Sequence, residues 1–137
     1  MRLGASLLIF LLAATPAFAG CLKFEPAEVT LTGVIHKHVD FGPPNYGEDP
    51  KTDSREAHLY LHLDKSVCVD ADPASYSDAV RNTKLMEMVY FVKLPFDHAW
   101  LDKHVSVTGT LFHAETAHHW TPALITPTET HVIGNRK

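Results

Sequence analysis

Residues 57–64 read AHLYLHLD, and this stretch decides the fold class of the chain. Leucines stand at positions 59, 61 and 63, and His58, Tyr60 and His62 alternate with them. Successive side chains of a β-strand point to opposite faces, so the spacing predicts a strand with a leucine face in the core. The histidines and the tyrosine would then form an outward face. A helix does not fit, because its apolar residues recur every three or four positions.

Similar segments flank this strand on both sides. The other predicted strands are 27–39, 66–70, 85–94, 105–112 and 118–126. The first of them alternates well, and Gly33 within it marks a bend or bulge. Residues 66–70 continue the 57–64 strand after a turn or bend, and the last two segments are predicted to pair as a hairpin. The tail beyond Pro127 is polar, so we expect it to be frayed.

Three connections have recognisable chemistry. Residues 41–56 are dense in Gly, Pro, Asn and Asp and predict a long loop, which in a compact domain is often functional. Phe96 and Trp100 are four residues apart, so a short helix within 95–104 would bury both rings on one side. Asp72 and Pro73 are compatible with the start of a short helix over 73–82, and an irregular loop fits that segment equally well.

The resulting order is three strands, one short helix and two strands. This is the order of a small five-stranded OB-like Greek-key barrel, mainly β, with its short helix between strands 3 and 4. A small β-sandwich is the alternative. No internal repeat or domain-sized change of composition divides residues 20–137, so we expect a single domain there.

The first nineteen residues predict a secretory signal peptide. Arg2 supplies the positive charge, residues 3–14 form an apolar stretch, and Ala17-Phe18-Ala19 resembles a cleavage site. The apolar stretch is too short to span a membrane, and no later segment is long and apolar enough to do so. We therefore expect a periplasmic or secreted protein.

The two cysteines, Cys21 and Cys68, both follow the predicted cleavage site. An even cysteine count in an exported chain predicts a disulfide. Phe18 to Cys21 also resembles a lipobox, and a lipoprotein anchored at Cys21 is the alternative. Lipidation would leave Cys68 unpaired, and Phe18 stands where such boxes usually carry Leu, so we favour the disulfide.

The charge balance argues against nucleic acid as a partner. Without Arg2, the remaining chain has 11 basic and 16 acidic residues. Binding to phosphates requires a concentrated basic face. All ten histidines lie in this remaining part of the chain.

Four segments together resemble a bacterial family of small exported domains whose function is unassigned. They are CLKFEP (21–26), GPPNY (42–46), DKSVCVDAD (64–72) and VTGTLFHAETAHHWTP (107–122). The resemblance implies an exported domain with an OB-like core and agrees with a Cys21–Cys68 disulfide. It implies no activity. Lys103-His104 stands where members often have Gly-Lys, so the turn into the next strand would differ.

No enzyme signature occurs in the sequence. A GxSxG elbow, an HExxH helix, a phosphate-binding loop and a CxxC motif are all missing. This favours binding over catalysis, and we assign no catalytic residue.

The predicted fold suggests where a ligand would bind. OB-folds bind ligands on the outer face of strands 2 and 3, between the loops that join strands 1–2 and 4–5. The candidates are Tyr46 in the 41–56 loop and the outward residues His58, Tyr60 and His62. Such aromatic and imidazole groups suit an envelope protein or a cell-wall oligosaccharide, although solvent-exposed decoration would have the same pattern.

Metal binding, with zinc as the candidate ion, is the alternative function. In the predicted hairpin His113 would oppose His118, with Glu115 in the turn, as half of a zinc site. The same register would pair Leu111 with Trp120 in the core and would turn His119 toward Phe112. His36 and His38 form an H-x-H pair that can chelate, but no third ligand is evident. A structural or pH-sensitive role for this His-rich hairpin, 113–119, explains the same residues.

Overall fold

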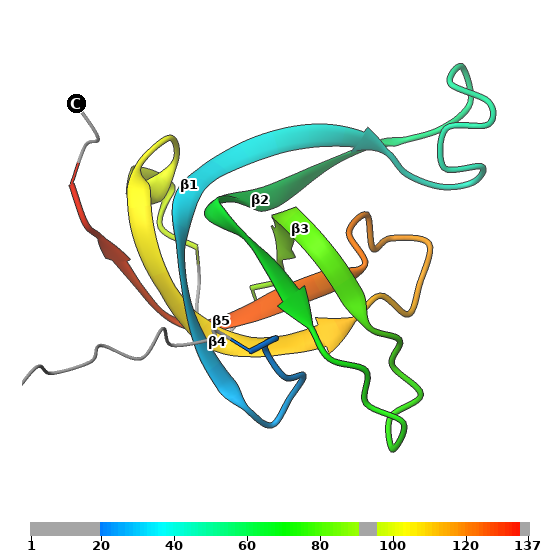
Figure 1. Ribbon diagram of the computed structural model, residues 1–137. Helices are drawn as coiled ribbons and strands as arrows, with labels where there is room; N and C mark the ends of the chain where they lie inside the picture. Colours follow the sequence, from blue (N-terminus) through cyan, green and yellow to red (C-terminus); the bar gives the residue numbers. More distant parts are fainter. Residues whose placement is uncertain (1–19, 91–95, 135–137) are drawn as a thin grey trace, which may run out of the picture.

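In residues 20–90 and 96–134, which the computed structural model describes, five strands form one sheet that closes into a barrel (Figure 1). The strands are β1 (Glu28–Phe41), β2 (Arg55–Val69), β3 (Val80–Met88), β4 (His104–His113) and β5 (Ala123–Val132). Neighbours follow the order β1-β2-β3-β5-β4, and β4 closes the ring on β1. The mainly β prediction is confirmed. The predicted signal peptide, 1–19, lies outside the described residues.

The long strand β1 closes the barrel because it pairs with two neighbours. Its first half is antiparallel to β4 and its second half is antiparallel to β2. Gly33 belongs to both ladders, opposite Leu63 and Val105, and neither ladder shifts register there. The glycine is instead required by close approach, since a Cβ at this position would overlap the backbone carbonyl of His62.

The leucine face predicted from AHLYLHLD lies in the core. Leu61 and Leu63 are buried, and β2 runs without a break through the predicted 66–70 segment, with two register shifts. The largest fully buried side chains come from all five strands and include Ile35, Leu61, Met86, Val105, Leu111 and Ile125. Apolar burial on this scale is the main stabilising contribution to a small barrel.

The predicted hairpin between the last two strands is wrong in register. His113 pairs with Ala123, and Leu111 with Ile125, so residues 114–122 form a nine-residue loop rather than a tight turn. Hydrogen bonds within the loop explain its length, because the His119 ring accepts the Glu115 N–H and the Pro122 carbonyl accepts the Ala114 N–H. β5 therefore starts later than predicted, and the tail that we expected to be frayed is a strand as far as Val132.

The same shift removes Trp120 from the core, where the predicted register had placed it. Its side chain is 38% exposed. His119 does lie beside Phe112, as predicted, with ring centroids 5.5 Å apart.

In its described part, residues 96–103, the connection to β4 contains a 3-10 turn, η1 (His98–Trp100), in place of the predicted short helix. The Asp97 side chain caps this turn by accepting the Ala99 N–H. Phe96 and Trp100 do bring their rings together, with centroids 5.7 Å apart. Strand β3 starts and ends earlier than the predicted strand 85–94, of which residues 91–94 lie outside the described part.

A disulfide joins Cys21 to Cys68, as predicted, with an S–S distance of 2.10 Å. It fixes the segment before β1 to the end of β2, where Leu22 forms a parallel bridge with Val69. Of the segment 73–82, residues 73–79 form a loop and residues 80–82 already belong to β3. Within the described ranges, no helix has the length and apolar character needed to cross a membrane.

Candidate ligand-binding face

Histidines gather on the outer side of β1, β2 and β3, on the opposite side of the sheet from the leucine core. We call this surface the histidine face and define it as His36, His38, His58, Tyr60, His62 and Glu87. The register brings them together, because His36 lies opposite Tyr60, His38 opposite His58, and Tyr60 opposite Glu87.

The His62 ring contacts two other imidazoles of this face. Nε2 of His62 lies 3.3 Å from Nε2 of His38, and the rings of His62 and His36 are 4.7 Å apart in an edge-to-face arrangement. Nδ1 of His36 lies 2.7 Å from Oδ1 of Asp102. Partial burial, together with charge on His36 and His38, lowers the pKa of His62 below its ordinary value. The cluster therefore disfavours a charge on its central ring.

Tyr60 lies on the histidine face, but it is only 3% exposed. The His38 ring lies 4.7 Å from its ring, and its hydroxyl donates to Asp40 at 2.8 Å. Burial, followed by the hydrogen bond to Asp40, raises the pKa of Tyr60 far above its ordinary value. Only the small part of Tyr60 that the neighbouring rings leave exposed is therefore accessible to a ligand.

The covered end of the face holds a histidine–carboxylate pair. Nδ1 of His58 lies 2.7 Å from Oε1 of Glu87. The other Glu87 oxygen accepts the backbone N–H of Trp120 at 2.8 Å, and the Thr121 hydroxyl accepts the backbone N–H of Glu87. These contacts, and not the sheet alone, hold the 114–122 loop over β3.

The loop between β1 and β2, residues 42–54, is organised by Asp53. Its carboxylate accepts the backbone N–H groups of Asn45, Gly47 and Asp49. Burial alone would raise the pKa of Asp53, but these hydrogen bonds hold it below its ordinary value. The long loop predicted from its Gly and Pro content therefore has a defined conformation that presents Tyr46.

Tyr46 and His118 connect this loop to the 114–122 loop. The Tyr46 hydroxyl lies 3.0 Å from Nε2 of His118, and Nδ1 of His118 lies 3.1 Å from Oε2 of Glu56. Since the carboxylate accepts at Nδ1, the hydroxyl donates to Nε2. In Figure 1 the 42–54 loop lies at the upper right of the barrel, the 114–122 loop at the right and the 70–79 loop at the lower right. The two joined loops border one end of the histidine face.

The structure separates the histidines that were predicted to face each other in the hairpin. Nδ1 of His113 lies 3.0 Å from the carbonyl of Ala114, and its ring contacts Phe24. His118 instead contacts Tyr46 and Glu56. Among the described residues, no group of three His, Cys, Asp or Glu side chains is arranged to hold a metal ion.

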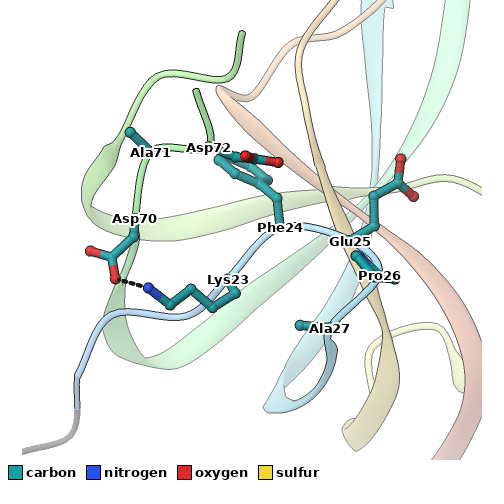
Figure 2. A pocket seen from close by; sticks show the side chains of 8 residues that line it. All are labelled: Lys23, Phe24, Glu25, Pro26, Ala27, Asp70, Ala71 and Asp72. Carbon is teal, nitrogen blue, oxygen red and sulfur yellow. Dashed lines mark hydrogen bonds and ion pairs between the residues drawn. The ribbon is translucent and has the colours of Figure 1, made fainter. Parts of the chain in front are cut away.

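Two hollows in the surface are candidate binding sites. The larger, of about 540 Å³, lies beside the segment before β1 and is drawn in Figure 2. Lys23, the basic residue in its lining, already pairs with Asp70 at 2.7 Å. The smaller, of about 380 Å³, is lined by His58, Glu87 and His118 and adjoins the histidine face. Of these two hollows, only the smaller one is lined by candidate residues.

Sequence reasoning missed the carboxylates that organise the site. Glu56, Asp53 and Asp102 have polar neighbours in the sequence and give no signal. Glu87 does give one, because it stands between Met86 and Met88 in the otherwise apolar run 85–92. A carboxylate in such a position is rarely buried unless it is paired.

Comparison with known proteins gives one match. Residues 97–129 match the family model described as Domain of unknown function (DUF4431), over a segment shorter than half of the chain. This supports a resemblance to a family without an assigned function. No curated protein and no solved structure matches the chain.

Proposed function

We propose that this chain is an exported binding module of the cell envelope that recognises a protein or a cell-wall oligosaccharide. The observation that carries the proposal is the histidine face together with the loop pair that borders it. The contact of Tyr46 with His118 brings two loops, 72 residues apart in sequence, to the same end of that face.

The chemistry of the face suits recognition. Imidazole rings combine apolar surface with a polar edge, as does the phenol of Tyr46 in the bordering loop, and this favours contacts with polar ligands that also have apolar faces. Four of its six members are histidines, so the face can both donate and accept hydrogen bonds. None of its members stands beside a serine or cysteine nucleophile in a triad-like arrangement that the described residues reveal.

We propose in addition that the barrel is OB-like. The strand order, the antiparallel β1-β2-β3 meander and the parallel pairing of β3 with β5 are compatible with that Greek-key fold. OB-folds bind ligands between the loops that correspond to 42–54 and 114–122 here. Export rests on the sequence of residues 1–19 and fits a disulfide-bonded chain.

A capture experiment tests the proposal. Purified protein is incubated with isolated cell-wall material and, separately, with solubilised envelope proteins, and bound material is recovered. Tyr46→Ala should abolish capture. Tyr76→Ala is a matched control, because Tyr76 is also a loop tyrosine with a left-handed backbone, with φ 56° against 51° for Tyr46. Equal capture by the two variants would contradict the proposal.

A further inference from the structure

A cleft opens where β2 and β3 separate, at the edge of the histidine face. The ladder between the two strands ends at the pair Leu59–Met88, where β3 pairs with β5. The cleft has a volume of about 380 Å³, which is within the range of small-molecule sites. His58 and Glu87 lie on its sheet side, and His118 and His119 come from the loop above.

His58 has an unsatisfied hydrogen-bonding atom beside this cleft. Its Nε2 is buried and has no hydrogen-bond partner among the residues that the structure describes. A carboxylate can only accept, so Nδ1 donates to Oε1 of Glu87, while the other Glu87 oxygen accepts the Trp120 N–H. A neutral His58 ring therefore presents a lone pair at Nε2. An unpaired buried acceptor is costly, and a ligand that donates to it recovers that cost.

A second acceptor lies close to this atom. Oε2 of Glu56 is 3.7 Å from Nε2 of His58, beyond hydrogen-bond distance. Two donors on one ligand would pair with both acceptors. Glu56 also accepts from His118, and the side chains of these two residues are 31% and 50% exposed. Both side chains are therefore partly open to solvent, from which a ligand group can reach Glu56.

We infer that the cleft binds one sugar ring of a neutral saccharide through two adjacent hydroxyl groups, one donating to Nε2 of His58 and the other to Glu56. This inference rests on the proposed function and names its ligand class. Trp120, with its ring 6.4 Å from that of His58 and partly exposed, provides a surface for the C–H face of the sugar.

A lysine ammonium of a peptide could donate to the same two acceptors. The walls of the cleft include Leu59, Met88 and Val89. An ammonium group loses far more hydration free energy beside such walls than a hydroxyl does, so the cleft favours the neutral ligand.

The test is a titration of the purified chain with neutral disaccharides (chitobiose, cellobiose and maltose), followed by NMR of the histidine and tryptophan rings. At least one sugar should produce saturable shifts at His58 and Trp120. Glu56→Ala should lower the affinity for that sugar by at least about tenfold, since the complex loses a hydrogen bond to a charged group. Glu129→Ala removes an exposed glutamate on β5 and should leave the affinity unchanged.

Three results would overturn the inference. The first is no saturable shift with any sugar at its highest soluble concentration. The second is equal weakening by Glu56→Ala and Glu129→Ala, with both variants folded by circular dichroism. The third is a response of His58 to a lysine-containing peptide but to no sugar. If Tyr46-dependent capture of an envelope protein persists in any of these cases, the proposed function stands and only the saccharide assignment fails.

Discussion

His58 and Glu87 form a largely buried imidazole–carboxylate pair, with 2.7 Å between Nδ1 of His58 and Oε1 of Glu87. Glu87 is 3% exposed although it lies on the outer side of β3. The loop that follows β4 covers it and donates the Trp120 N–H to its second oxygen. One carboxylate therefore orients a candidate ligand-binding ring and anchors the loop above it.

Removing this carboxylate should destabilise the fold. Glu87→Ala leaves the His58 ring and the Trp120 N–H without their acceptor, and we expect a loss of about 3 kcal/mol in the free energy of unfolding. Urea denaturation measures this as a lower midpoint with an unchanged m-value. Glu129→Ala is the control and should change stability by no more than about 0.5 kcal/mol. Equal midpoints for the two variants would refute the anchoring role.

The disulfide should supply a large part of the net stability. Cys21 and Cys68 are separated by 47 residues, and closing such a loop is worth about 4 kcal/mol in the chain-entropy model. A double Cys21→Ser, Cys68→Ser variant should lose roughly that amount. Its unfolding midpoint should also be insensitive to reductant, whereas that of the wild-type protein should fall. A wild-type midpoint that reductant leaves in place would contradict this expectation.

The histidine cluster should make the fold sensitive to mild acid. The pKa of His62 is lowered in the folded state from an ordinary value of 6.5, so the unfolded chain binds this proton more readily. Well above pH 6.5 His62 is neutral in both the folded and the unfolded state, so its titration does not change the stability. As the pH falls below that value, the unfolded state gains its proton first, and stability declines until the folded pKa is passed.

His62→Asn should remove this component of acid sensitivity. The measurement is the difference in unfolding free energy between wild type and variant across the pH range on either side of 6.5. His131→Asn is the control, since His131 is exposed near the end of β5. If the wild-type protein and His62→Asn lose stability in parallel as the pH falls, His62 does not contribute to the acid sensitivity.

The contact between Tyr46 and His118 should restrain both loops. His118→Ala should increase amide hydrogen exchange in residues 42–54, because it removes the partner of Tyr46 and of Glu56. His113→Ala is the matched control, since its ring contacts Phe24 instead. If zinc stabilised the protein only when both His113 and His118 are present, the two histidines would share an ion, which would contradict their separate contacts in the structure.

The barrel was largely predictable, because strand alternation is local. The AHLYLHLD pattern alone determines which side chains of β2 face the core, and the alternation of 27–39 and 105–112 does the same for β1 and β4. The register of β5 was not predictable in this way. It depends on a nine-residue loop held by the buried Glu87, which is a contact between residues 33 positions apart.

The candidate site was predictable in its location but not in its contacts. His58, Tyr60 and His62 lie on the predicted outer face, but no local pattern indicates that Tyr60 is covered or that His62 contacts His36 and His38. Long side chains on adjacent strands can reach diagonal neighbours, and which neighbour each side chain contacts depends on the curvature of the barrel. The prediction that His113 and His118 face each other is wrong because it assumed a short turn between the last two strands, and the loop there has nine residues.

Site-specific photo-cross-linking tests the central claim, that the joined loops border the ligand surface. A benzophenone amino acid is placed at position 46 or at position 76, and each protein is irradiated in intact envelopes. Tyr76 is 94% exposed on the 70–79 loop, at the lower right in Figure 1, and is not a member of the Tyr46–His118 pair that joins the other two loops. We predict a discrete cross-linked product from position 46 and none from position 76. A product from position 76 alone would contradict the assignment of the binding surface.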